Sequence, residues 1–279
     1  GSGPAPSAGR VAFQVTDYTV VGASGFVGSR LSAALRKRGA QVFEPVRGDP
    51  ELLTRDLGHV FYCAGLTADF MVRPFDTVDA HVGLLSQILR AGRFERLIYT
   101  SSTRLYDSLG ARGGHEDDIL EFDVAAPRNV YDLSKALGEN LCLARAEGRG
   151  VVARLGNVFD WSQDAGGFLS EILKRARRER SMTLASSPQA GRDYIHSDDV
   201  IAALLAMDDQ GVQGVINIAR GEAISNAAIA DVFEQAGWRL TLTGADVSPP
   251  GPACDISRLR ALGVAPQDVR EVLARILAA

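Results

Sequence analysis

Short apolar runs alternate with amphipathic stretches along the first 150 residues of the chain. Residues 18–22 form an apolar run that a glycine ends, which is typical of a buried strand. Residues 25–38 carry apolar side chains at helical spacing, and this stretch ends at Gly39. The same patterns predict strands at residues 41–46, 60–64, 96–100 and 151–155, and helices at residues 78–89 and 131–145. The alternation predicts an α/β fold with a parallel sheet, because right-handed crossovers place helices on both of its faces.

The alternation loosens after about residue 158. Apolar runs at residues 182–185 and 215–218 alternate there with predicted helices at residues 198–207, 226–235 and 267–277. Ser197 and Ser225 stand where N-caps belong. We therefore predict one domain over residues 11–158 and a smaller lobe over residues 159–279, with elements interleaved with the sheet.

Two segments show no such pattern. Residues 1–10 are rich in small side chains and lack an apolar core, so they indicate a cloning remnant and a disordered lead-in instead of a signal peptide. Residues 175–180 form a basic run, for which we expect a solvated helix end, with contact to a substrate phosphate as the alternative.

Composition narrows the classes of function. The 279 residues include 30 basic and 34 acidic side chains, and a net charge of −4 argues against nucleic acid or an anionic membrane as partner. No apolar stretch reaches the roughly 18 residues of a transmembrane helix. Three isolated cysteines (Cys63, Cys142 and Cys254) and four scattered histidines fit a cytoplasmic protein with reduced thiols and no zinc site.

Three glycines lie between the first predicted strand and the first predicted helix. In this context Gly22 permits a sharp turn, Gly25 lets a pyrophosphate approach the backbone, and Gly28 lets helix and strand pack closely. The unpaired N–H groups of the helix would face the anion. The sequence therefore predicts a dinucleotide site, the alternative being a glycine-rich turn without a ligand.

The end of the second predicted strand selects the ribose of such a cofactor. An acidic residue there accepts the 2′-hydroxyl of NAD, whereas an arginine pairs with the 2′-phosphate of NADP. Arg47 falls near the expected position, and Glu44 lies earlier on a different register. We therefore favour NADP(H) over NAD(H).

A phenol, an ammonium and a hydroxyl form the candidate catalytic group. Tyr131 and Lys135 are four residues apart on one helix face, and a lysine beside a phenol lowers the phenol pKa toward neutrality. Ser102 lies at the end of the strand that begins near Arg96, where open α/β sheets bind ligands. The alternatives are an ordinary pair on an exposed helix and a hydroxyl that only satisfies backbone groups.

Eight short segments carry a further resemblance, which covers the chain from about residue 17. They lie at residues 22–28, 63–66, 101–106, 131–135, 154–159, 192–200, 214–221 and 255–258. With them the sequence resembles the extended short-chain dehydrogenase/reductase family, the epimerase/dehydratase group that acts on nucleotide sugars. The resemblance implies a Rossmann-type doubly wound sheet that binds NAD(P), a C-terminal lobe that binds a nucleotide-diphosphate sugar, and a homodimer formed through helices near residues 78–89 and 131–145.

The resemblance also implies roles for individual residues. Ser102, Tyr131 and Lys135 would be catalytic. The implied cofactor-binding residues are Gly22, Ser24, Gly25, Phe26, Val27, Gly28, Arg47, Cys63, Ala64, Gly65, Tyr131 and Lys135. The implied substrate-binding residues are Thr67, Ser102, Thr103, Asn157 and Arg192, with Arg192 facing the diphosphate.

The chain departs from the family pattern at several positions. Thr103 and Arg104 replace the Asp-Glu pair of the 4,6-dehydratases, which disfavours dehydration. Thr67 and Asp107 replace a usual Lys and Gly, and the Asn of the helix before the Ser-bearing strand is replaced near Ala80 and His81. We expect a keto-sugar reductase acting at C4, with a 4-epimerase that retains NAD and a non-catalytic cofactor-sensing or scaffold protein as alternatives.

Overall fold

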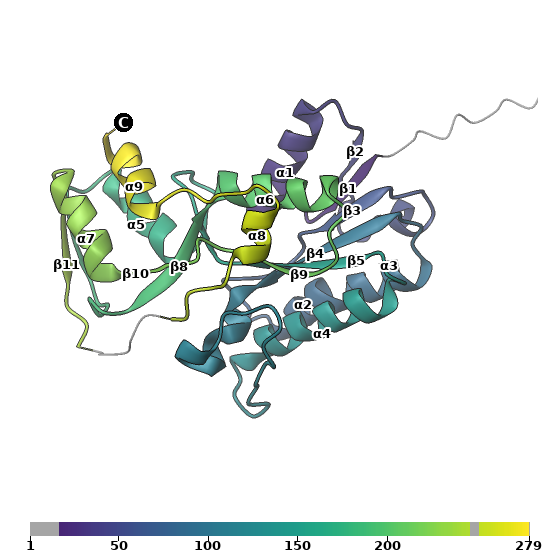
Figure 1. The fold of residues 1–279 in the computed structure, drawn as a ribbon, viewed down its shortest axis with the longest axis horizontal. Helices are drawn as coiled ribbons and strands as arrows, with labels where there is room; N and C mark the ends of the chain where they lie inside the picture. The colour runs from purple at the N-terminus through teal and green to yellow at the C-terminus, as the bar shows by residue number, and fades with distance from the viewer. Residues whose placement is uncertain (1–16, 246–250, 279) are drawn as a thin grey trace, which may run out of the picture.

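A six-stranded parallel sheet forms the centre of the molecule (Figure 1), as the sequence predicted. The computed structural model describes residues 17–245 and 251–278, so the expected lead-in at residues 1–10 lies outside it. The strand order is β2-β1-β3-β4-β5-β9, and every neighbouring pair is parallel. The strands are β1 (Tyr18–Val21), β2 (Val42–Phe43), β3 (His59–Tyr62), β4 (Arg96–Ser102), β5 (Gly150–Leu155) and β9 (Gly214–Ile218).

Helices cover both faces of this sheet. In Figure 1, α1 (Phe26–Lys37) and α6 (Ser197–Asp209) lie above it, and α3 (Leu84–Ala91) and α4 (Asn129–Arg145) lie below it. Strand alternation supplies both layers. Phe61 of β3 packs in the core under α1 and α6, and its neighbours Val60 and Tyr62 pack in the core with α3.

The order of the strands reverses beside β1, because β2 lies on one side of it and β3 on the other. Doubly wound sheets bind ligands in the crevice beyond the carboxyl ends of the strands at such a point. The loops that follow β1 and β3 are in contact there, since a Cβ on Gly22 would stand 2.7 Å from the backbone nitrogen of Ala64. The fold thus brings the glycine-rich loop and residues 63–65 to one place.

The C-terminal part adds two small sheets and its own core. One sheet has the order β10 (Ala223–Ser225), β8 (Gly191–His196) and β6 (Asn157–Phe159), and the other pairs β11 (Arg239–Leu242) with β7 (Ser181–Leu184). Helices α5 (Phe168–Ala176), α7 (Asn226–Gln235) and α9 (Val269–Ala278) pack around them at the left of Figure 1, and α8 (Ser257–Ala261) lies near its centre. Strand β9 runs back from this part into the central sheet.

Some predicted elements have other bounds. The strand expected over residues 41–46 has only two residues, since Pro45 has no N–H to donate, and a short 3₁₀ helix, η1 (Pro50–Leu53), follows it. The helix expected over residues 78–89 consists of α2 (Pro74–Val78), a π-helical turn η2 (Asp79–Gly83) and α3.

The predicted N-caps were half right. Ser225 caps α7 by accepting from the backbone N–H of Ala228. At α6 the prediction was wrong, because His196 is the N-cap and the Ser197 hydroxyl donates to the Asp160 carboxylate instead. Within residues 17–245 and 251–278 no helix is both long and apolar enough to cross a bilayer.

Candidate active site

The glycine-rich loop fits a bound anion. Gly22 has φ +84°, a conformation that favours glycine, and a Cβ on Gly28 would stand 2.3 Å from the Gly22 carbonyl oxygen. Gly25 is the N-cap of α1, and neither a capping side chain nor an acidic residue occupies the first turn. The first N–H groups of α1 therefore have no side-chain partner, and Ser24 and Gly25 are exposed beside them.

The three predicted catalytic residues converge at the carboxyl end of β4. Ser102 ends that strand, and a hydrogen bond joins its side chain to Tyr131 of α4. Lys135 lies one turn further along α4, and its Nζ donates to the Thr100 carbonyl oxygen at 2.8 Å. A Cβ on Gly65 would stand 3.5 Å from the same Nζ, so the group also adjoins the loop after β3. The geometry brings the phenol, the ammonium and the hydroxyl together beyond the carboxyl end of β4, the side on which open α/β sheets bind ligands.

Burial dominates the electrostatics of this group. It lowers the pKa of Lys135 to about 8, against the opposing influence of Cys63 and Glu139. It also raises the pKa of Tyr131, while the hydrogen bond from Ser102 and the positive charge of Arg104 partly offset that rise. The prediction that Lys135 lowers the pKa of Tyr131 was therefore wrong for this structure. The Lys135 ammonium is directed to the Thr100 carbonyl, and the cation that acts on the phenol is Arg104.

Arg104 is a site residue whose position sequence reasoning missed. It lies on the 3₁₀ element η3 (Thr103–Arg112), with its guanidinium carbon 4.9 Å from the centre of the Tyr131 ring and 4.6 Å from that of Phe70. Its Nε lies 3.3 Å from Oδ1 of Asp132, which orients the side chain. A permanently charged guanidinium can stabilise a phenolate but cannot exchange protons. The departure from the family pattern at Arg104 was visible in the sequence, but its contact with Tyr131 was not.

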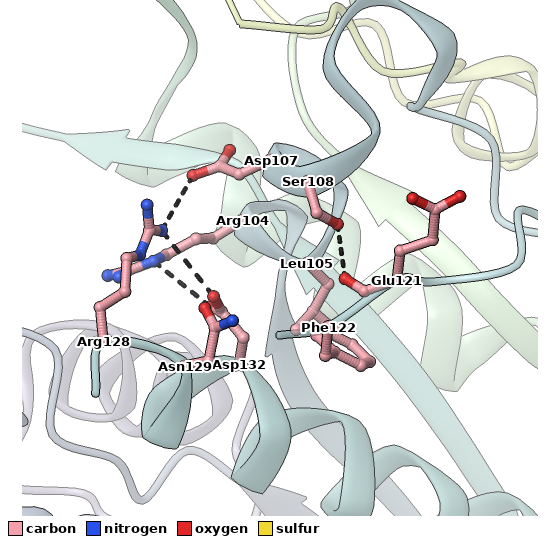
Figure 2. Close-up of a pocket in the computed structure, with 9 residues that line it drawn as sticks. All are labelled: Arg104, Leu105, Asp107, Ser108, Glu121, Phe122, Arg128, Asn129 and Asp132. Atoms are coloured by element: carbon pink, nitrogen blue, oxygen red, sulfur yellow. Dashed lines mark hydrogen bonds and ion pairs between the residues drawn. The ribbon is translucent and has the colours of Figure 1, made fainter. Parts of the chain in front are cut away.

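A chain of alternating charges runs outward from Arg104. Figure 2 shows Arg128 between Asp132 and Asp107, with ion pairs of 3.8 and 3.5 Å, and Arg104 beside Asp132. The chain continues to Arg192, whose Nη1 lies 3.6 Å from Asp107. Arg192 on β8 and Arg104 under Tyr131 thus belong to one network, although 88 positions of sequence separate them.

The predicted substrate-side residues occupy different environments. Asn157 on β6 is exposed and donates to the Asp193 carbonyl oxygen, and Arg192 on the paired strand β8 is exposed too. Thr67 is exposed in the loop after β3. Thr103, in contrast, is buried, and its side chain hydrogen-bonds the Cys254 thiol. The structure therefore leaves Thr67, Asn157 and Arg192 accessible but not the Thr103 side chain.

The two candidates for ribose selection differ in their partners. Glu44 follows β2, and its carboxylate pairs with Arg36 of α1 at 2.8 Å. Arg47 is 78% exposed, and its Nη2 lies 3.3 Å from Oδ1 of Asp76 in the first turn of α2. Arg73 pairs with the same carboxylate. Arg47 is therefore the more exposed of the two, and each of them has an ion-pair partner.

Comparison of the sequence with known proteins identifies one family. A model of the NAD dependent epimerase/dehydratase family matches residues 18–219. The chain is 25% identical over 254 residues to a dTDP-4-dehydro-6-deoxy-D-allose reductase of Streptomyces bikiniensis, which covers 76% of this chain and 78% of that protein.

Solved structures show the same fold. MoeE5 in complex with UDP-glucose and NAD has a TM-score of 0.77 at 23% identity and covers 94% of this chain and 97% of its own. RMD from Pseudomonas aeruginosa complexed with NADPH has a TM-score of 0.70 at 23% identity and covers 94% and 98%. The Rossmann-type fold predicted from the sequence is confirmed.

Replacing the buried ammonium tests these electrostatics. At pH 7 Lys135 is charged in both the folded and the unfolded chain, so the fold bears the cost of burying the charge. We expect Lys135→Met to raise the free energy of unfolding by about 2 kcal/mol, because each pKa unit corresponds to about 1.4 kcal/mol and the lost hydrogen bond offsets about 1 kcal/mol. Thermal unfolding should show a Tm higher by about 4–8 °C.

The stability difference between the wild type and Lys135→Met should change with pH in a defined direction. Between pH 8 and 10.5 the folded wild-type protein loses this proton while the unfolded chain keeps it, so its stability gains on that of the variant. Lys37→Met, at an exposed position of α1, is the control and should leave Tm within about 1 °C. A lower Tm for Lys135→Met at pH 7 would contradict the assignment.

Proposed function

Because the chain belongs to the NAD dependent epimerase/dehydratase family, we propose that it is an NADP(H)-dependent reductase that acts at C4 of a nucleotide-activated keto-hexose. The observation that carries the proposal is the pairing of Tyr131 with Ser102 beside Lys135, at the carboxyl end of β4 in the parallel sheet. The curated relative from Streptomyces bikiniensis is itself named as a reductase of a 4-dehydro sugar.

Tyr131 has the protonation state that a proton donor needs. When bound, the nicotinamide supplies the hydride that reaches the carbonyl carbon. Tyr131 gives its phenolic proton to the carbonyl oxygen, and the Ser102 hydroxyl donates a hydrogen bond to that oxygen as its negative charge grows. Burial raises the pKa of Tyr131, so the residue rests with its proton in place, as a donor must. The charge of Arg104 then stabilises the phenolate.

The residues after Ser102 argue against dehydration. Elimination of water needs an acid and a base beside the reacting carbons. Thr103 is buried against Cys254, and Arg104 cannot exchange protons in the accessible pH range. We therefore propose no dehydratase activity for this site.

The direct test is oxidation of NADPH in the presence of 4-keto nucleotide sugars. We expect turnover with at least one of them, and Tyr131→Phe should lower kcat by about 100-fold or more. The variant keeps the packing of its ring against Phe70 and His81, so its stability should remain close to that of the wild type. Tyr18→Phe on β1 is the matched control and should leave kcat unchanged.

Three results would redirect the proposal. Failure to oxidise NADPH with any 4-keto nucleotide sugar would contradict it. Tightly held NAD that is released only on denaturation, without net turnover, would favour the 4-epimerase. An unaltered biological activity of Tyr131→Phe would favour the non-catalytic protein.

We propose NADP(H) as the preferred cofactor because Arg47 is exposed beside α2 and Glu44 is held by Arg36. Arg47→Ala should lower the preference for NADPH over NADH, measured as the ratio of kcat/KM values, by about tenfold, the loss of one charge-assisted contact to phosphate. Arg38→Ala, which removes another exposed arginine, paired with Asp209, should leave the ratio unchanged. An unchanged ratio in Arg47→Ala would overturn the preference.

We also propose a homodimer. Large apolar side chains project from α2 and α4, which are in contact with each other: Phe75, Val78, Leu137 and Leu143 are 85%, 40%, 49% and 39% exposed. A second copy would bury them. Phe75→Glu should halve the mass seen by analytical ultracentrifugation, whereas Ile119→Glu, at an 88% exposed loop position, should not. A monomeric wild-type protein would overturn the dimer.

We also propose that the protein is cytoplasmic. Cys63, Cys142 and Cys254 are all free thiols, which a reducing compartment maintains. Burial raises the pKa of the Cys63 thiol to about 12, so it does not act as a nucleophile at the site.

A further inference from the structure

A single arginine joins the helix after the glycine-rich loop to the C-terminal part of the chain. Arg30 is the fifth residue of α1, and its guanidinium makes five hydrogen bonds, as many as it has N–H groups. Nε donates to Asp160, Nη1 to Asp164 and to the Phe26 carbonyl oxygen, and Nη2 to Asp164 and Ser162, over distances of 2.6 to 3.2 Å. Phe26 belongs to α1, whereas the other three partners lie 130 to 134 positions later in the chain. The guanidinium therefore bridges two segments that are far apart in the sequence.

The near end of this bridge holds the first turn of α1. The Arg30 guanidinium carbon lies 4.0 Å from the centre of the Phe26 ring, and Nη1 donates to the carbonyl oxygen of the same residue. Phe26 follows Gly25, the N-cap, and its turn presents the N–H groups that have no side-chain partner. Glycine loses more conformational freedom than other residues when it is ordered. A loop that contains Gly22 and Gly25 is therefore stabilised by a neighbour that fixes the turn beside it.

The far end of the bridge is fixed to the C-terminal part. Asp160 directly follows β6, and its carboxylate accepts from Arg30 Nε at 3.2 Å and from the Ser197 hydroxyl of α6 at 2.5 Å. The backbone N–H of Asp160 donates to the Ser170 hydroxyl of α5 at 3.3 Å. Asn157, a predicted substrate-side residue, lies on the same strand β6. Arg30 thus connects the helix beside the predicted dinucleotide loop to a strand of the predicted sugar-binding lobe.

The ion pairs of Arg30 are strong enough to persist at neutral pH. The side chains of Arg30 and Asp160 are 23% and 19% exposed, so water and salt screen this pair less than the pair with Asp164, which is 58% exposed. Hydrogen bonds to Asp164 raise the pKa of Arg30, and hydrogen bonds from Arg30 lower the pKa of Asp164. Two nitrogens of Arg30 meet the two oxygens of Asp164, a bidentate contact that a lysine cannot reproduce.

We propose that Arg30 is a positioning residue, which holds the first turn of α1 against residues 160–164 and so keeps the glycine-rich loop ordered before a dinucleotide binds. The inference rests on the proposed function only in that this loop receives a dinucleotide. Order that exists before binding reduces the conformational entropy that is lost on binding, and therefore lowers the Kd. Arg30 acts through its protein partners, since each of its five hydrogen bonds is made within the chain.

Replacement of the guanidinium tests this role. We expect Arg30→Met to raise the Kd for NADPH about tenfold and Arg30→Lys to raise it about threefold, because a lysine keeps the charge but not the bidentate contact. NADH should show the same factors, since the two dinucleotides share the pyrophosphate. Lys37→Met, at an exposed position of the same helix, is the control and should change either Kd by less than about twofold. Binding is measured by fluorescence titration without sugar, and thermal unfolding shows that each variant is folded at the temperature of the titration.

A double-mutant cycle with Asp164→Asn shows whether Arg30 acts through the C-terminal part. Asp164→Asn should raise the Kd for NADPH about threefold in the wild type, because it removes the bidentate contact, and should not raise it further in Arg30→Met. An unchanged Kd in Arg30→Met, even with a lower Tm, would show a purely structural role and overturn the proposal. An equal rise on Asp164→Asn in both backgrounds, or an unchanged Kd in Asp164→Asn alone, would overturn it too. If Arg30→Met does not fold, Arg30→Lys takes its place in the cycle.

The role of Arg30 and the reductase activity fail separately. A cycle that behaves as expected while no keto sugar is reduced would support the role of Arg30 and overturn the reductase. Turnover of a keto sugar together with an uncoupled cycle would do the reverse. A wild-type protein that binds neither dinucleotide would overturn both.

Discussion

A positive charge buried between helix α4 and the carboxyl ends of β3 and β4 is the constraint around which the site is built. The Lys135 ammonium is buried, so each of its protons needs an acceptor within the protein or on a ligand. The Thr100 carbonyl is one such acceptor, and it belongs to the strand that ends at Ser102. One hydrogen bond therefore fixes the distance between the helix that carries Tyr131 and the strand that carries its hydroxyl partner.

The close approach of backbone segments makes this arrangement possible. Gly138 allows α4 to pass over the Tyr99 hydroxyl, since a Cβ there would stand 2.2 Å from that oxygen, and Tyr99 in turn donates to the turn that holds His81. On the other side, Gly22 lets the first loop lie against Ala64. Small residues at these crossings keep the glycine-rich loop, the β3 loop and α4 close to one another.

The sequence was sufficient to predict the features that depend on local pattern. Strand–helix alternation predicted the parallel sheet, and its handedness rule places Gly22, Ser102 and Lys135 at one edge because each follows or faces the carboxyl end of a strand. The four-residue spacing of Tyr131 and Lys135 predicted a shared helix face, which the structure has.

Features that depend on tertiary contacts could not be predicted. The Lys135 ammonium donates to the Thr100 carbonyl oxygen, and the Arg104 guanidinium lies over the Tyr131 ring. These contacts depend on burial and on the path of η3. The π turn at His81 is stabilised by hydroxyls from β3 and β4, which periodicity along one helix does not reveal. Likewise, the Ser197 hydroxyl donates to Asp160, which lies 37 positions earlier in the chain, instead of capping its own helix.

The return of β9 to the central sheet has a consequence for how the molecule can be divided. Its partner β5 precedes the C-terminal part, whereas β9 itself is reached only after the chain has passed through β6, β7, β8 and α6. A fragment that stops before β9 would present the open edge of β5 to other chains, and such edges invite aggregation. The central sheet therefore needs residues from both parts of the chain, and neither part can be exchanged between proteins without the other.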